Sequence, residues 1–312
     1  MIPVVPIKTG FLSHLSPFAK IIFTLMLVII GLLVAVLASL ILTMVQYHAD
    51  LSKSILLLSD TTNPSLISLL KELQILQSVF LFIIPAFVAA YFFERDSLGY
   101  FGMKKNPGGI IILFTFLIMF ACLPLINWMV SLNELMKLPA SLAGMEDWMK
   151  SAEDQAARIT VSFLDVHSMG GFFVNMIMIA IIPAIGEELL FRGMLQRLFG
   201  EGFRNIHIAI FVSAFLFGAI HLQFYGLLPR MMLGVMFGYL YLWTGTLWVP
   251  IIAHFVNNGA AVVVSYLSNT GVIHSDYEKF GATDNVILIV GSVLFSGALL
   301  FGIYRMGRKQ EG

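Results

Sequence analysis

The sequence GEELLFR at residues 186–192 interrupts an otherwise apolar run from about residue 172 to 198. Adjacent carboxylates are unexpected there, because a charge near the middle of a membrane helix costs a few kcal/mol or more and usually faces a wet interior. In a helix, Glu188 and Arg192 share one face in the order that favours ion pairing, whereas Glu187 points about 100° away. We therefore interpret the stretch as a functional site. The alternative is that Glu188 and Arg192 only neutralise each other while Glu187 bonds a neighbouring helix.

The composition indicates a polytopic membrane protein. Hydrophobic residues make up 59% of the chain and charged residues 12%, against about 25% charged in soluble proteins, and the mean hydropathy is +0.91. A net charge of zero without a basic run gives no electrostatic support for a nucleic-acid partner. Cys122, the only cysteine, lies in an apolar run and is expected to be a small buried hydrophobic residue.

Eight apolar runs are each about long enough to cross a bilayer. We therefore predict an all-α fold, in which residues 1–312 form one membrane domain of about eight transmembrane helices. The fifth and sixth runs are short, so one of them could be re-entrant. The runs cover approximately residues 21–45, 73–93, 109–130, 172–196, 206–222, 227–243, 247–268 and 285–304.

The distribution of basic residues predicts the orientation. With the N-terminus inside, the cytoplasmic segments hold ten Lys and Arg residues in about fifty-five, and the outer segments hold seven in about ninety. We therefore expect both termini in the cytoplasm. The long outer connection at 131–171 carries apolar residues at near-helical spacing and predicts an amphipathic interfacial segment covering the bundle, with a gating or partner-binding role as the less favoured alternative.

Two further spans carry polar residues that could join the glutamates. His221 ends the fifth run, and His254 and Asn258 lie one turn apart on one face of the seventh. A single membrane histidine is more often an interhelical hydrogen-bonding residue than a catalyst, but several such residues on nearly successive spans favour a site. The spacing Gly234-x-x-x-Gly238 in the sixth run predicts a close helix approach.

These residue types suit hydrolysis. Glu187 can act as general base toward a water that His221 helps to hold, while His254 and Asn258 can donate hydrogen bonds to the oxyanion that develops at an attacked carbonyl. Alternatively, Glu187, His221 and His254 could hold a divalent metal such as zinc that activates the water. The residues alone do not separate these mechanisms, so the cofactor stays open.

The ordered motifs Glu187-Glu188-x-x-x-Arg192, Phe217-x-x-x-His221 and His254-x-x-x-Asn258 resemble the CPBP family. This family comprises CAAX-processing intramembrane endopeptidases of the Ras-converting type and bacterial relatives linked to bacteriocin self-immunity. The resemblance covers a protease core at about residues 172–267, and no motif position departs from the pattern.

The resemblance implies an eight-helix bundle with a cavity open toward the cytoplasm, located in a bacterial inner membrane. It also implies cleavage of a peptide or protein substrate, lipidated in some members, at the membrane lipid. Glu188 and Arg192 would be structural supports. Motifs of site-2, rhomboid and presenilin-like proteases are absent from the sequence. The rival hypothesis is a non-catalytic protein, either an immunity-type peptide binder or a transporter that uses the glutamates as a proton relay.

Overall fold

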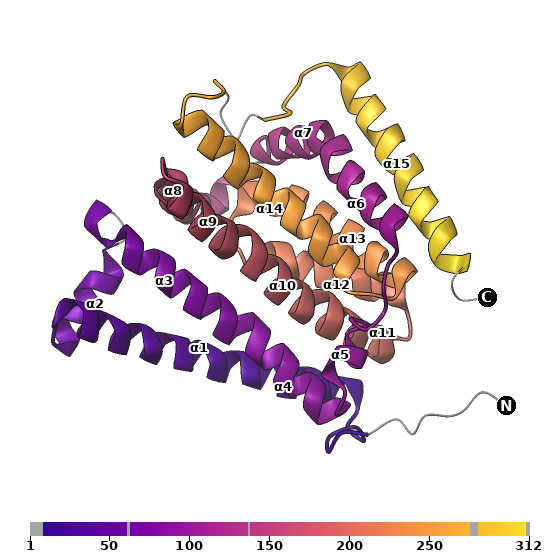
Figure 1. The fold of residues 1–312 in the computed structure, drawn as a ribbon, viewed down its shortest axis with the longest axis horizontal. Coiled ribbons are helices and arrows are strands. Elements are labelled where there is room, and N and C mark those ends of the chain that lie inside the picture. Colours follow the sequence, from indigo (N-terminus) through magenta and orange to yellow (C-terminus); the bar gives the residue numbers. More distant parts are fainter. Residues whose placement is uncertain (1–8, 61–62, 137, 275–279, 310–312) are drawn as a thin grey trace.

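The computed structural model describes residues 9–60, 63–136, 138–274 and 280–309, and its regular structure there is helical (Figure 1). The predicted all-α class is confirmed, the one extended feature in these ranges being an isolated bridge between Thr9 and Glu94. The α-helices are α1 Pro17–Tyr47, α2 Leu51–Ser59, α3 Ile67–Ser78, α4 Ile84–Phe93, α5 Ser97–Tyr100, α6 Gly109–Ala121, α7 Leu123–Glu134, α8 Ala143–Leu164, α9 Met169–Asn175, α10 Ile182–Glu188, α11 Arg197–Phe203, α12 Ile206–Ala219, α13 Leu227–Thr244, α14 Trp248–Asn269 and α15 Val286–Lys309.

Short segments of different helical pitch join several of these helices. Three are π-helical and make α3–α4 and α9–α11 continuous rods, and three are 3₁₀ turns that open a helix. The π-helical segments are η2 Val79–Ile83, η4 Met176–Ile181 and η5 Leu189–Gln196, and the 3₁₀ segments are η1 Pro64–Leu66, η3 Ala140–Leu142 and η6 Phe224–Gly226.

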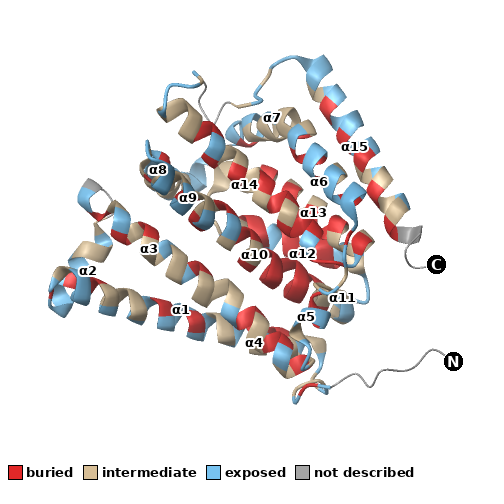
Figure 2. Cartoon of the chain, viewed as in Figure 1, coloured by how far each residue is buried: buried red, intermediate tan, exposed pale blue. Residues whose placement is uncertain are grey.

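Five helical rods among the described residues are long and apolar enough to cross a membrane, and six if the bent pair α6–α7 is one span. The prediction of about eight spans is therefore not met, although each predicted run is helical. The shortfall falls on two neighbouring helices. The α12 helix has only 14 residues, which is about 21 Å of helix. The α13 helix contains Pro229 and Arg230, which lower its hydropathy. The two helices pack together as a hairpin, in which one face of each helix is buried against protein (Figure 2). The other face of α12, with Ile208, Phe211 and Phe215, is exposed.

The basic segments predicted to be cytoplasmic meet at one end of the bundle. In Figure 1, α1 begins and α15 ends on the side where α5 and α11 also lie. Arg197 Nη2 donates to Glu94 at 2.9 Å, and Trp248 Nε1 donates to the Met103 carbonyl at 2.8 Å. We call this the basic end. Lys8, Lys137 and Lys279, which the charge count includes, lie outside the described residues.

The helix α8 lies at the opposite end of the bundle (Figure 1). The long connection contains a helix, but it begins at Ala143 and so includes only the later part of the predicted apolar spacing. It packs on α3 and α14, with the Phe163 ring against Lys71 and the Leu164 carbonyl accepting a hydrogen bond from Ser265. In its N-terminal half Met145 and Trp148 stay exposed, as expected for a helix whose apolar face meets the membrane interface.

The predicted close approach at Gly234 and Gly238 is confirmed. A Cβ atom added at Gly234 would lie 2.9 Å from Ala214 Cβ, and one at Gly238 would lie 2.7 Å from Gln196 Oε1. Gln196 Nε2 also donates to the Gly238 carbonyl at 3.1 Å. These two glycines bring α13 against α12 and η5, the segment that carries Arg192.

Replacing Gly238 by alanine should destabilise the protein by about 1–3 kcal/mol, because the added methyl group overpacks a contact that cannot open without moving Gln196. Thermal unfolding in detergent measures the change. Gly291→Ala is the matched control, since nothing lies within 4 Å of a Cβ atom there. Equal unfolding temperatures for the two variants would contradict the close-packing argument.

Candidate active site

Glu187 and Glu188 end α10, at the centre of the rod formed by α9, η4, α10, η5 and α11. Gly186 places them close to a second rod, since a Cβ atom there would lie 2.9 Å from Phe82 Cβ in η2. The following segment, η5, has π-helical hydrogen bonds, which are rare and frequent at functional sites. Ser213 of α12 donates to the Phe191 carbonyl in this segment at 2.9 Å, which ties α12 to the rod.

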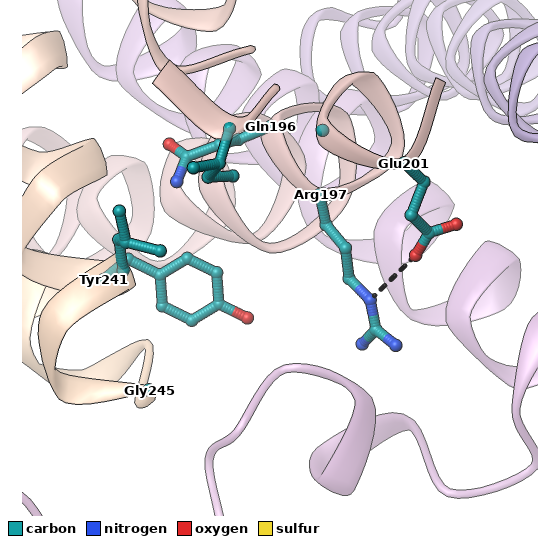
Figure 3. A pocket seen from close by; sticks show the side chains of 8 residues that line it. Gln196, Arg197, Glu201, Tyr241 and Gly245 are labelled. Carbon is teal, nitrogen blue, oxygen red and sulfur yellow. Dashed lines mark hydrogen bonds and ion pairs between the residues drawn. The ribbon is translucent and has the colours of Figure 1, made fainter. Parts of the chain in front are cut away.

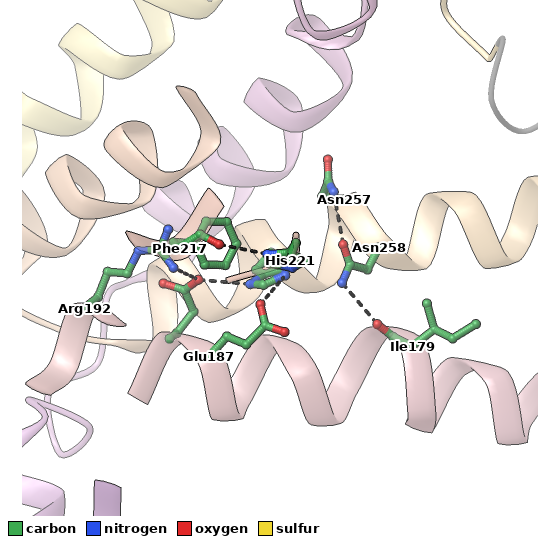
Figure 4. Close-up of polar contacts among 9 residues, drawn as sticks. Ile179, Glu187, Arg192, Phe217, His221, Asn257 and Asn258 are labelled. Atoms are coloured by element: carbon green, nitrogen blue, oxygen red, sulfur yellow. Dashed lines mark hydrogen bonds and ion pairs between the residues drawn. The ribbon is translucent and has the colours of Figure 1, made fainter. Parts of the chain in front are cut away.

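Glu188 is the centre of a buried ionic cluster (Figure 4). Its Oε1 atom accepts a hydrogen bond from Arg192 Nη1 at 2.6 Å and contacts His254 Nδ1 at 2.9 Å. The Glu188 and Arg192 side chains are 0% and 1% exposed. The ion pair expected from their spacing is therefore present, and it has a third member from α14 that the spacing did not predict.

Two aromatic rings enclose this cluster. The Arg192 guanidinium carbon lies 4.3 Å from the ring centre of Phe217 and 5.3 Å from that of Phe237, so both rings contribute cation–π attraction. The His254 ring stacks on Phe237 at 5.6 Å and meets Phe217 edge to face at 5.8 Å. These contacts fix the orientation of both the guanidinium and the imidazole ring.

Glu187 lies beside the cluster and is differently placed. Its Oε2 atom is buried and has no hydrogen-bond partner among the described residues. The nearest cationic group that forms an ion-pair contact with it is His254, whose Nε2 atom is 3.8 Å away. The Glu187 side chain also lines a cavity. It thus combines a free acceptor atom with access to a bound molecule.

The hydrogen bonds of the two histidines determine which nitrogen of each is available. His221 Nδ1 lies 2.8 Å from the Phe217 carbonyl, which can only accept, so Nδ1 carries the proton and Nε2 is free. By the same reasoning, ionised Glu188 requires a proton on His254 Nδ1. Both rings therefore present Nε2 to the interior.

A cavity of about 650 Å³ joins most of the proposed site residues. Glu187, His221 and Asn258 line it, whereas His254 lies behind Glu187. The lining residues come from α3, α8, η4, α10, α13, α14 and the connection after α12: Gln74, Ala156, Ile159, Thr160, Phe163, Leu164, Met178, Ile179, Pro183, Glu187, His221, Gln223, Arg230, Asn257, Asn258 and Ala261.

Asn258 is held by the same rod that carries the glutamates. Its Nδ2 atom donates to the Ile179 carbonyl at 3.1 Å, and its Oδ1 atom accepts from Asn257 at 3.1 Å. Pro183 has no N–H to bond the carbonyl four residues earlier, so the Asn258 amide supplies a donor to Ile179. One Nδ2 hydrogen remains for another acceptor.

The side chains proposed as metal ligands, Glu187, His221 and His254, are present in the site but do not converge on one point. Among the described residues, no three or more His, Cys, Asp or Glu side chains are grouped so as to hold a metal ion. Glu187 and His254 are neighbours, but together with His221 they do not form such a group. We therefore derive no step through a metal.

A second cavity, of about 420 Å³, lies near the basic end (Figure 3). Its arginine, Arg197, is satisfied by protein groups, because it pairs with Glu94 and Glu201 and donates to the Tyr100 carbonyl. This cavity therefore holds a structural ion-pair network and none of the motif residues.

Several residues of the site were not singled out from the sequence. Phe237 and Gln223 carry no motif signal, and Asn257 was visible only as a neighbour of Asn258. Arg230 was visible in the sequence as a cation inside an apolar run, but it was used only in the count of basic residues that predicts the membrane orientation. The spacing of apolar residues in the long connection did not show that α8 forms part of the cavity wall.

A helical membrane bundle with a buried carboxylate–histidine centre beside a polar cavity belongs to the class of polytopic membrane proteins with an intramembrane acid–histidine site. Residues 169–260 match the family described as type II CAAX prenyl endopeptidase Rce1-like. The chain therefore carries a CPBP-type domain of this family at these residues, as its three motifs predicted.

The chain is also similar to an uncharacterized bacterial protein, YpbD of Bacillus subtilis (strain 168). The two are 35% identical over 86 residues, which are 26% of this chain and 41% of YpbD. The chain thus spans about two fifths of the length of this relative. No solved structure matches the chain significantly.

Removing Arg192 alone should leave Glu188 as a buried charge without its strongest partner. We expect Arg192→Met to lower stability by about 3–5 kcal/mol and the double variant Arg192→Met, Glu188→Gln to recover a large part of that loss. Thermal unfolding of wild type, both single variants and the double variant measures the coupling. Additive losses in the double variant would show that the two side chains do not stabilise each other.

Proposed function

We propose that this chain is an intramembrane endopeptidase that hydrolyses a peptide bond of a membrane-associated substrate, with its protease core at residues 172–267. The family of its domain supports a peptide substrate and proteolytic chemistry. The observation that carries the proposal is Glu187 Oε2, an unpartnered buried acceptor in a cavity and 3.8 Å from His254 Nε2. Membrane lipid and a peptide, lipidated in some relatives, would be its partners.

In the proposed reaction Glu187 first accepts a proton and later donates it. A substrate water held by Glu187 and His221 gives a proton to the carboxylate while its oxygen attacks the carbonyl carbon of the scissile bond. As the C–N bond of the tetrahedral intermediate breaks, Glu187 gives the proton to the leaving amine. One water is consumed, and one carboxylic acid and one amine are formed.

His254 and Asn258 are proposed to stabilise the oxyanion of that intermediate. Asn258 has one amide hydrogen left for this purpose. Because Glu188 occupies the Nδ1 proton of His254, the ring can donate from Nε2 only when both nitrogens are protonated. The hydrogen bond to Glu188 also fixes the orientation of the ring, which gives the structural carboxylate a second role.

The proposed location is a bacterial inner membrane, which the apolar helices and the bacterial relative support. If the basic end is cytoplasmic, as the positive-inside rule favours, the α8 side of the cavity faces away from the cytoplasm. This differs from the cytoplasmic opening that the family resemblance implied. We therefore propose that substrate reaches the site from the α8 side.

Glu187→Gln should lower the rate of peptide cleavage by about 10²–10⁴-fold, because the amide cannot accept the proton of the attacking water. Cleavage of fluorogenic membrane peptides by protein in nanodiscs measures the rate. Glu201→Gln, an exposed carboxylate of the second cavity, is the matched control and should keep the wild-type rate. An active Glu187→Gln protein would remove the proposed mechanism.

The same preparation distinguishes the metal alternative and the non-catalytic alternative. Full activity in excess chelator supports direct water activation, whereas stoichiometric zinc that is lost in His221→Ala would assign catalysis to a metal. A protein that binds peptides and never cleaves them would favour the immunity-type function.

Cysteine labelling tests the orientation, because native Cys122 is buried and should give little background. We expect a membrane-impermeant maleimide to label Ser151→Cys on α8 in intact cells, and Asn106→Cys at the basic end only after permeabilisation. Both replaced residues are exposed. The reverse pattern would restore a cytoplasmic opening.

A further inference from the structure

Arg230 is a cation of the catalytic cavity that the proposed reaction does not use. It lies in the first turn of α13 and lines the cavity together with Glu187 and His221. Its Nη2 atom donates to Gln223 Oε1. Its Nη1 atom is buried and has no hydrogen-bond partner among the described residues.

Arg230 differs from Arg192 and Arg197 in that it has no carboxylate partner among the described residues. Arg192 contacts Glu188, and Arg197 contacts Glu94 and Glu201. No carboxylate of the described residues lies within ion-pair distance of Arg230, and Glu153 and Glu187 act on it only at longer range. A guanidinium in a membrane protein interior is costly unless an anion contacts it.

The local backbone leaves room for this guanidinium. A side chain at Gly226 would overlap Arg230 Nη1, so the absence of a Cβ atom there is what allows the group to lie against the chain. Gln223 anchors the other end of the fork. Glu153 of α8 accepts a hydrogen bond from the Tyr225 amide at 3.0 Å with its Oε2 atom, and it forms no ion pair with Arg230 among the described residues. The group is thus held in place with the two N–H donors of Nη1 unpartnered in the part of the chain that the structure describes.

We propose that Arg230 binds a carboxylate of the peptide substrate and so selects which peptide bond reaches Glu187. A guanidinium presents a planar set of donors that matches a carboxylate better than any other side chain does. The carboxylate can be the C-terminus of the peptide or an acidic side chain. This inference rests on the proposed function for its substrate class, although the binding event does not require cleavage.

The size of the cavity places this carboxylate close to the scissile bond. About 650 Å³ accommodates a small-molecule ligand or a few residues of peptide, and Arg230 and Glu187 line the same space. A substrate whose carboxylate meets Arg230 therefore has its cleavable bond within a few residues of that group.

The test is a binding measurement with an apolar tripeptide that carries fluorescein at its N-terminus. Three forms are compared: the free acid, the C-terminal amide, and a C-terminal amide in which one residue is glutamate. Fluorescence anisotropy with nanodisc-embedded protein gives each Kd, and mass spectrometry shows that the probe stays intact. We expect wild type to bind the free acid about tenfold to hundredfold more tightly than the plain amide.

Arg230→Gln should weaken binding of the free acid to the level of the amide and leave the amide unchanged, whereas Arg95→Gln, an exposed arginine of the basic end, should keep the preference. Arg230→Lys should keep a reduced preference, because an ammonium lacks the planar fork. If Arg230→Gln does not fold, the comparison of acid and amide on wild type and Arg230→Lys decides.

Tight binding of the glutamate-bearing amide identifies a side-chain carboxylate as sufficient, and weak binding restricts recognition to the C-terminus. Equal affinity of wild type for all three probes, or an undiminished preference for a carboxylate in a folded Arg230→Gln protein, overturns the proposal. Because the probe is not cleaved, a failure of proteolysis would refute the proposed function without touching this result.

Discussion

The structure depends on the burial of the Glu188 carboxylate. A fully buried carboxylate is costly unless donors contact it, and here one donor comes from its own rod and one from α14. The rings of Phe217 and Phe237, from α12 and α13, then cover Arg192 and His254. Four helical segments are therefore positioned by the need to satisfy one charge, and a shift of any of them would expose or unpair it.

This requirement explains why small residues matter in the α12–α13 hairpin. The covering rings of Phe217 and Phe237 come from these two helices, which must therefore pack closely against each other and against η5. Gly234 and Gly238 meet that need. The predicted number of spans exceeds the five or six that qualify, because an apolar run in the sequence does not show that α12 ends after 14 residues or how far Pro229 and Arg230 lower the hydropathy of α13.

Much of the centre was predictable because its contacts are local or chemically unusual. The Glu188–Arg192 pair follows from helical spacing alone, and an intramembrane glutamate next to it is conspicuous. The joining of His254 to Glu188 instead depends on how α14 packs, which periodicity does not encode. Arg230 was visible as a charge, but only the fold shows that no carboxylate contacts it. The cavity wall formed by α8 likewise required the path of a long connection.

The two adjacent glutamates illustrate how position on a helix divides chemistry. They differ by one residue and therefore by about 100° in direction, which turns Glu188 into the ionic cluster and Glu187 into the cavity. Two donors contact one oxygen of Glu188, whereas Oε2 of Glu187 has no hydrogen-bond partner among the described residues. A carboxylate committed to Arg192 and His254 cannot exchange protons with a substrate without breaking those bonds. The Glu187 carboxylate can exchange protons with a substrate without breaking such bonds. The Glu188 carboxylate holds the His254 ring, whose Nε2 atom lies 3.8 Å from Glu187.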